Sequence, residues 1–422
     1  MTAVILFGTF FMFMALTVPI AIALGLAGLV TALYSTNITV TFLSQSLVTS
    51  TDNFALMAIP FFILAGEIMG KGGISTKLFD LANVFVGRYT GGFAMAAIIT
   101  CMFFAAISGS GPATVAAVGG IMIPAMVAQG YDKKFATAVI VTAGSLGIII
   151  PPSIPMVLFG ISSSESIGDL FIGGILPGIF IGICLMVYAY FHSKKMGYKG
   201  TGENFSFKRL LSAINKAKWS LLVPIIILGG IYGGLFTPTE AAVVAVVYAL
   251  IVSLFLHKEL KFKDLHGIFR DATLSSVAIL IIIGTANAFG TILSMERIPQ
   301  AVANAFLTVS ENGFVVLLMI ILLLLLIGCF IDTSAAVIIF TPILFPVALQ
   351  IGMDPIHFGV VMIVTLAIGF ITPPLGVNLF VGSGISGVSM PALVKAVIPF
   401  FIVMLVAALI IAFVPQLTLL FL

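Results

Sequence analysis

Residues 108–126 read SGSGPATVAAVGGIMIPAM, and residues 331–347 read IDTSAAVIIFTPILFPV. A shift of 222 residues, without a gap, superposes these two stretches and extends well beyond them. Most of the matched positions hold residues that break or cap helices. The shift aligns Ser110 with Asp332, Pro124 with Pro346, Gly130 with Gly352, Asp132 with Asp354, Gly147 with Gly369, Pro151-Pro152 with Pro373-Pro374, Gly160 with Gly382 and Pro177 with Pro399. Single proline matches arise by chance in apolar sequence, but this many at one offset predict an internal repeat.

The amino-acid composition indicates what surrounds the folded chain. Of the 422 residues, 61% are hydrophobic and 8% are charged, against about 25% charged in an average soluble chain. Many apolar runs reach the roughly 20 residues that a membrane-spanning helix needs. They lack the alternation, in strands of about ten residues, that is typical of an outer-membrane barrel. The sequence therefore predicts an all-α polytopic protein of an inner or cytoplasmic membrane, with the lipid bilayer as its surroundings.

The residues that other functions need are missing or scattered. No glycine-rich phosphate loop and no nucleotide-binding fingerprint occur, so we expect no ATP hydrolysis, no organic cofactor and no nucleic-acid partner. The three cysteines and four histidines have neither disulfide-framework nor metal-ligand spacing. No nucleophile–base pair is visible at membrane depth, so we do not expect an enzyme. The first residues lack a basic stretch before a long apolar run, which favours a mature membrane segment over a cleaved signal.

Apolar runs and breakers divide the chain into two halves. We predict a first repeat over 1–193, a basic cytoplasmic loop over 194–217 and a second repeat over 218–422, with a short charged loop near 257–271. Each repeat has two arms around a polar break, at 92–128 and 313–349, and a span broken by Pro-Pro, at 134–163 and 356–386. Residues 4–33 are expected to form two short helices with an outside N-terminus. Further spans are predicted at 54–70, 169–193, 218–236, 238–257, 272–294 and 390–415, with amphipathic interfacial helices at 74–88 and 298–309.

Span parity and charge predict that the two repeats are inverted relative to each other. Between residues 91 and 312 lie five predicted spans, and the arms at 92–128 add none or two, so the number of crossings is odd. With residues 194–217 in the cytoplasm, as the positive-inside rule demands, only Arg297 of the 18 Lys and Arg residues falls outside. Inverted repeats are the architecture of many secondary transporters, which bind their substrates near the midplane between the halves.

Four breaks at membrane depth form the candidate site, because 108–112 pairs with 330–334 and 150–153 with 372–376. Irregular backbone is tolerated at this depth only where it is buried in protein or lines a cavity. Half-helix starts favour an anionic substrate, and half-helix ends favour a cation such as Na⁺. Alternatively, proline and glycine only kink helices, and serine and threonine bond their own backbone; two symmetric pairs favour a site. The oxygen donors beside the breaks are Ser108, Ser110, Thr114, Ser153, Thr333, Ser334, Thr372 and Asn378.

These breaks yield two predicted residue sets. The substrate-binding set is Ser110, Ser153, Asp332 and Asn378. The Na⁺ set is Ser108, Gly109, Ser110, Gly111 and Pro151 in the first half and Asp332, Thr333, Ser334, Thr372 and Pro373 in the second.

Among the carboxylates, Asp332 follows a long apolar run, where a charge costs about 2.5–3.5 kcal/mol. It is predicted to act at the site, and capping the helix over 335–349 is a compatible role. Glu67 and Glu240 lie near span ends and are predicted to be solvated or interfacial.

The two quoted stretches, together with IIIPPS (148–153) and FITPPLGVN (370–378), resemble the large membrane subunit of tripartite ATP-independent periplasmic (TRAP) transporters. The similarity covers nearly the whole chain, including AIPFFILAGEIM (58–69) and LFTPTEAA (235–242). It implies re-entrant hairpins in a moving transport domain, a scaffold domain, an elevator-type motion and Na⁺-coupled uptake. It also implies a small four-helix membrane subunit, a periplasmic substrate-binding protein and an organic acid substrate of the C4-dicarboxylate or sialic acid type.

Other functions remain as alternatives. The first is a stand-alone Na⁺- or H⁺-coupled carboxylate or anion transporter of the related superfamily that shares inverted hairpins. A channel is a second alternative, but it would need rings of like residues along a pore, and the single Asp332 argues against it.

Overall fold

The computed structural model describes residues 2–34, 39–200, 206–374 and 376–422. Over these residues the regular elements are all helices, and no strand occurs among them. Eight helices of this described part are long and apolar enough to cross a membrane. These observations confirm the prediction of an all-α polytopic membrane protein.

In the first half, the helices follow the predicted apolar runs closely, and residues 4–33 form two short helices as expected. An additional helix, α3, covers residues for which the sequence map gave no element. The helices are α1 (Thr2–Ala15), α2 (Ile20–Tyr34), α3 (Val40–Thr49), α4 (Ala58–Lys71), α5 (Ile74–Val86), α6 (Gly92–Ser108), α7 (Gly111–Ala128), α8 (Lys133–Gly144), α9 (Ile154–Ser163) and α10 (Ile167–Met196), with 3₁₀ turns η1 (Phe54–Met57) and η2 (Ser145–Ile148).

In the second half, the helices again follow the predicted apolar runs. Its helices are α11 (Phe207–Tyr232), α12 (Pro238–Ile251), the π-helical turn η3 (Val252–Leu256), α13 (Phe262–Met295), α14 (Ile298–Val309), α15 (Gly313–Gly328), α16 (Thr333–Gln350), α17 (Pro355–Gly369), α18 (Val377–Ser386), α19 (Met390–Phe413) and α20 (Gln416–Leu419).

Helix bounds recur at the spacing found in the sequence. α7 spans 111–128 and α16 spans 333–350, so both ends differ by 222 residues. α8 begins at Lys133 and α17 at Pro355, again 222 residues apart. Each helix of these pairs flanks one of the four predicted breaks, so the two halves place their interruptions at similar positions.

One long helix differs between the halves. α13 runs unbroken over 262–295, whereas the corresponding residues of the first half form α3 and α4 with a gap between them. The gap contains Thr51-Asp52-Asn53, and the Asn53 side chain accepts a hydrogen bond from Ala55 N (2.9 Å) and so starts η1. Side chains of this kind compete with helical hydrogen bonds. At the matching positions of α13 stand Thr273, Leu274 and Ser275, of which leucine is a strong helix former.

Two segments predicted as loops are largely helical, which corrects the sequence map. α11 begins at Phe207, inside the predicted basic loop over 194–217, and α13 begins at Phe262, inside the predicted loop near 257–271. The start of α11 is amphipathic. Ala213 and Ala217 are buried against Leu81 of α5, while Lys216 between them is exposed. The high charge content of these residues led to the prediction of loops, but it did not exclude a helix with one apolar face.

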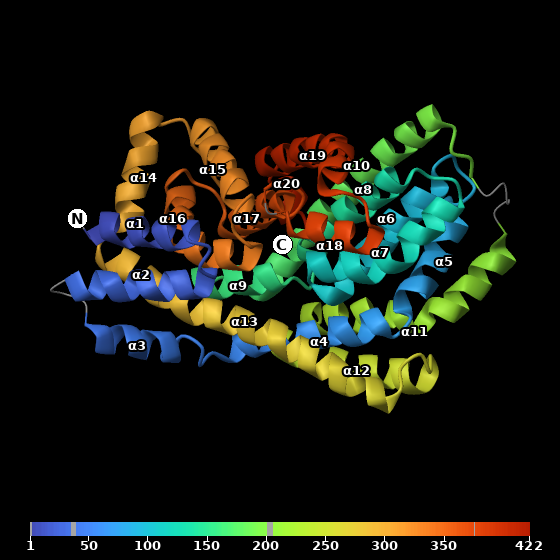
Figure 1. Ribbon diagram of the computed structural model, residues 1–422, viewed down its shortest axis with the longest axis horizontal. Helices are drawn as coiled ribbons and strands as arrows, with labels where there is room; N and C mark the ends of the chain where they lie inside the picture. Colours follow the sequence, from blue (N-terminus) through green and yellow to red (C-terminus); the bar gives the residue numbers. More distant parts are fainter. Residues whose placement is uncertain (1, 35–38, 201–205, 375) are drawn as a thin grey trace.

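The broken helices lie in the interior. Every residue from Phe135 to Gly144 of α8 and from Ile356 to Gly369 of α17 is buried. Figure 1 shows α13 running along one side of the molecule beside α3, α4 and α12, with α6–α10 and α15–α19 stacked above it. α13 contacts α2, α3, α4 and α16. The break after α8 is therefore buried inside the helical assembly, where irregular backbone requires internal partners. At the break after α17, Thr372 is half-buried, and Pro373 and Pro374 are exposed.

Candidate functional site

The first candidate tip lies between α6 and α7. α6 ends at Ser108, Gly109 has a left-handed backbone (φ +60°), and Ser110 caps α7. The Ser108 hydroxyl lies 3.0 Å from Thr114 Oγ1, which donates a hydrogen bond to Ser110 O (2.8 Å). Both Ser108 and Thr114 are buried. The tip therefore concentrates hydroxyl and carbonyl oxygens without any charged side chain.

The first Pro-Pro break packs directly against this tip. Ile154 N at the start of α9 donates a hydrogen bond to Gly109 O (3.4 Å). The buried Ser153 hydroxyl bridges the break by donating to Ile148 O (2.6 Å) and accepting from Met156 N (3.4 Å). A Cβ on Gly147 would overlap the carbonyl group of Ser110 and lie 2.7 Å from Thr114 Oγ1. Only glycine leaves room for this backbone-to-backbone contact.

Asn378 comes from the other half of the chain. It lies on α18, just after the second Pro-Pro break, but its amide Nδ2 donates to Val141 O (3.1 Å) and Ser145 Oγ (3.2 Å) of the first half. Its Oδ1 atom is buried and has no hydrogen-bond partner in the described part of the protein. A Cβ on Gly111 would lie 3.3 Å from this oxygen. The structure thus brings an unpaired buried acceptor to the first tip.

The second tip has a similar backbone contact and different side chains. A Cβ on Gly369, at the end of α17, would overlap the backbone of Gly328, the last residue of α15. Asp332 caps α16 and accepts a hydrogen bond from Ser334 N (2.9 Å). Thr372, at the second Pro-Pro break, donates to Ile368 O (2.7 Å). Asp332 is half-buried, so this tip carries one partly buried carboxylate.

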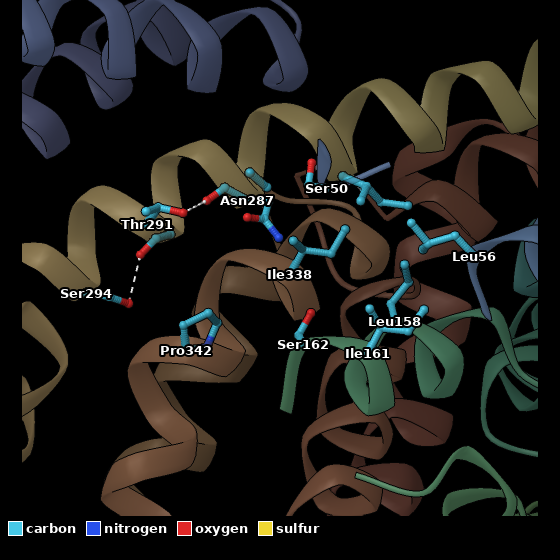
Figure 2. A pocket seen from close by; sticks show the side chains of 13 residues that line it. Ser50, Leu56, Leu158, Ile161, Ser162, Asn287, Thr291, Ser294, Ile338 and Pro342 are labelled. Atoms are coloured by element: carbon cyan, nitrogen blue, oxygen red, sulfur yellow. Dashed lines mark hydrogen bonds between the residues drawn. The ribbon is translucent and has the colours of Figure 1, made fainter. Parts of the chain in front are cut away.

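Two cavities lie between α13 and the arms. The inner cavity, about 340 Å³, is lined by Ser108 and Ser110 of the first tip together with Glu67 and Ser275. The outer cavity, about 310 Å³, is lined by α9, α13 and α16. Figure 2 shows its polar wall on α13, where Asn287, Thr291 and Ser294 follow one another along the helix. One pair of lining positions, Ala116 and Ile338, corresponds under the 222-residue shift.

Residues 7–417 match the family model described as "Tripartite ATP-independent periplasmic transporter, DctM component". The chain belongs to this family of TRAP transporter permeases. The match confirms the resemblance found in the sequence, and with the apolar spans it identifies a multi-pass inner-membrane protein.

The names of similar proteins agree with this family assignment. The chain is 48% identical to the isethionate TRAP transporter permease protein of Oleidesulfovibrio alaskensis, over 99% of this chain and 66% of that longer protein. It is 41% identical to the C4-dicarboxylate TRAP transporter large permease protein of Pseudomonas aeruginosa, over 94% and 93% of the two chains. It is also 35% identical to the sialic acid TRAP transporter large permease protein of Vibrio cholerae, over 95% and 94%. These relatives are named as permeases, which agrees with the expectation of a transporter.

A solved structure supports the fold. The Alcanivorax borkumensis YdaH transporter matches with a TM-score of 0.61, covering 96% of each chain. Only 14% of the residues are identical, so the likeness concerns the arrangement of helices alone.

Within the TRAP permease, the predicted site residues fall into two groups. Ser108, Ser110, Gly111, Ser153 and Asn378 gather at the first tip, including one residue that the sequence assigned to the second break. Asp332, Thr333 and Thr372 lie at the second tip or break, and none of them lines either cavity.

Sequence reasoning missed Asn287, Thr291 and Ser294 of the outer cavity. Their spacing along an otherwise apolar helix was a usable signal for a polar face. Glu67 was predicted to be solvated or interfacial. It lines the inner cavity, and its carboxylate lies 3.7 Å from Lys71 Nζ, which also pairs with Asp271 (3.1 Å). Glu240 forms a capping box with Thr237 at the exposed start of α12.

Proposed function

We propose that this TRAP permease carries out Na⁺-coupled uptake of a small organic acid across the inner membrane. The proposal rests on one observation at the first tip. There the unpaired Asn378 Oδ1 lies near the turn at Ser108–Thr114, which contributes hydroxyl and carbonyl oxygens. Small hard cations prefer oxygen ligands. A buried acceptor without a partner costs free energy, and a bound Na⁺ would remove that cost.

The proposed Na⁺ sites follow the two tips. Ser108, Gly109, Ser110, Gly111 and Pro151 would surround the first, with Asn378 as an added ligand from the other half. At the second tip, the ion would lie among Asp332, Thr333, Ser334, Thr372 and Pro373. There the Asp332 carboxylate would supply the charge that the first tip lacks.

The proposed substrate is a small organic anion with a carboxylate or sulfonate group. Relatives are named for isethionate, C4-dicarboxylates and sialic acid, which all carry an anionic group. Neither cavity has a lysine or arginine among its described lining residues. The anion would therefore be held by half-helix N-termini, such as the start of α9 at Ser153, and by neutral hydroxyl and amide groups. Ser110, Ser153, Asp332 and Asn378 remain the proposed substrate contacts.

The proposed mechanism is alternating access by an elevator motion. Two inverted repeats would place the hairpins α6–α7 and α15–α16, with both broken helices, in a transport domain that moves against a scaffold containing α13 and α4. The inner and outer cavities lie on this proposed boundary, because each is lined by α13 and by residues of a hairpin. Cysteines introduced at Gly200 and Gly352, after replacement of the three native cysteines, should react with an impermeant reagent from opposite sides of the membrane. Labelling of both from one side would refute the inverted arrangement.

The proposed partners are a small four-helix membrane subunit and a periplasmic substrate-binding protein. The experiment is reconstitution of the chain in proteoliposomes with and without these two proteins, followed by uptake of radiolabelled isethionate, succinate and sialic acid. We expect uptake of one acid only when all three proteins and a Na⁺ gradient are present. Full activity of the isolated chain would instead support the stand-alone anion transporter, and no uptake of any organic acid would contradict the proposal.

A further inference from the structure

We propose that the chain binds an anionic phospholipid in a basic cavity at the ends of α8, α10 and α19. This cavity has a volume of about 650 Å³ and is lined by Lys134 and Phe135 of α8, Tyr188 and His192 of α10, and Lys395 and Pro399 of α19, among others. It lies at the end of α8 opposite the Pro-Pro break. The inference rests on membrane embedding and not on the proposed transport function.

The charges of the cavity favour an anion. Lys134 and Lys395 reach it from two different helices, and within the described chain neither forms an ion pair with a carboxylate. Asp132 is the one acidic residue in the described lining. Its carboxylate is already bound to Lys134 N (2.9 Å) and Phe135 N (3.1 Å) at the start of α8. The start of α19 has no side-chain cap, so the positive end of its helix dipole adds to the two lysines.

The walls of the cavity suit a phospholipid better than a soluble phosphate. The Phe135 ring stacks on the His192 ring at 4.2 Å, and the Tyr188 hydroxyl lies 3.4 Å from His192 Nδ1. Beyond Lys395, the same face of α19 exposes Ile398 (50%), Ile402 (53%) and Val406 (50%). A cationic end followed by an apolar stripe along a spanning helix matches a charged headgroup followed by an acyl chain. Basic pockets between helices at the cytoplasmic surface are known to bind anionic headgroups.

The corresponding cavity of the other half shows that these charges are not a general feature of the fold. It lies at the starts of α15 and α17 and the end of α19, and its volume is about 510 Å³. Asp354 and His357 line it, and no lysine or arginine is among its described lining residues. Both ring nitrogens of His357 are engaged, with Thr418 Oγ1 (2.7 Å) and Ala412 O (3.1 Å). The corresponding cavity therefore lacks lysine and arginine and lies at the opposite end of α19.

The test is lipid binding to the purified full chain in neutral detergent, measured by native mass spectrometry. The probes are palmitoyl-oleoyl phosphatidylglycerol, the matching phosphatidylcholine, and sn-glycerol 3-phosphate as the free headgroup. Lys134→Gln with Lys395→Gln should weaken phosphatidylglycerol binding about tenfold or more, because each basic residue near the headgroup contributes to the attraction. Arginine at both positions should restore it.

The matched control is Lys208→Gln with Lys263→Gln, which removes two exposed charges outside the cavity. This control should bind phosphatidylglycerol as the wild type does. An equal loss in the control pair would show general surface attraction and overturn the site. Unchanged binding by the cavity variant, or binding of phosphatidylcholine as tight as phosphatidylglycerol, would also overturn it. Competition by sn-glycerol 3-phosphate at the lipid's own concentration would identify a soluble-anion site instead.

Discussion

The two tips occupy equivalent places in the halves of the chain but present different chemistry. The first tip, at Ser108–Gly111, is neutral, lines the inner cavity and receives Asn378 from the other half. The second, between Gly328 and Thr333, carries the carboxylate of Asp332 and lines neither cavity. What the halves share is backbone contact, because Gly147 and Gly369 each pack against the backbone of their tip. In both halves a glycine of the break thus packs against tip backbone, at Ser110 in the first and at Gly328 in the second, while the side chains differ.

The largest loss of uptake is expected from substitutions that disrupt the shared backbone contact. In Gly147→Ala, the new methyl group would overlap the Ser110 carbonyl, so tip and break must separate. Overpacking of this kind costs about 1–3 kcal/mol of stability, and a displacement of about 1 Å at a site can reduce rates roughly a hundredfold. Uptake in proteoliposomes and melting temperature measure both effects, and Gly369→Ala should behave likewise.

The matched controls for these glycines are Gly120→Ala and Gly384→Ala. Each lies on a helix next to the same tips or breaks, and a Cβ at either would meet no atom within 4 Å. Both controls should retain wild-type uptake. If the control and tip substitutions had equal effects, the backbone contact would not be the feature that the halves share.

A large effect confined to the second tip is expected for Asp332→Asn. The amide keeps the size and much of the capping ability of the carboxylate, so the free energy of unfolding should stay within about 1 kcal/mol of wild type. Uptake should fall about tenfold or more, because hydrogen bonds to charged groups contribute about 1.5–3 kcal/mol.

Asp354→Asn is the control for capping. Asp354 caps α17 by accepting from Ile356 N (2.9 Å) and His357 N (3.0 Å), far along the chain from either tip. It should change stability as little as Asp332→Asn and leave uptake intact. Normal uptake by Asp332→Asn would show that Asp332 acts only as a helix cap.

An intermediate effect is expected for Asn378→Ala, which removes the unpaired oxygen at the first tip. We expect the Na⁺ concentration for half-maximal uptake to rise by about fivefold, the equivalent of one neutral hydrogen bond. Ser145→Ala removes only a partner of the Asn378 amide nitrogen and should shift this concentration less. A larger shift for Ser145→Ala would assign Asn378 a packing role.

The smallest effect is expected for Glu67→Gln beside the first tip. Glu67 is partly exposed and shares Lys71 with Asp271, and such exposed pairs contribute at most about 1 kcal/mol. Uptake should change less than about threefold. A loss as large as that of Asp332→Asn would mean that the first tip, too, depends on a carboxylate.

Much of the fold was predictable because helix breakers interrupt long apolar runs. The bounds of α7 and α16 follow from Ser110, Asp332 and the glycines after each helix, all visible in the sequence. Amphipathic starts were harder, since charge along α11 and α13 concealed their apolar faces. Part of the site was also predictable, because the residues of one tip are sequence neighbours. The approach of Asn378 to α8, 237 residues away, depends on packing between halves, which no local pattern encodes. The cavities could not be predicted either, because they also depend on packing between segments that are distant in the sequence.

The central claim is that Na⁺ at the tips drives uptake, and it is tested most directly by exchanging the cation. Proteoliposomes containing the permease and its two partners would be given the transported acid with an inward gradient of Na⁺, K⁺ or choline, or with a proton gradient alone. We predict uptake with Na⁺ only, and coupling to more than one Na⁺ per substrate if both tips bind ions. Full uptake driven by the proton gradient without Na⁺ would contradict it.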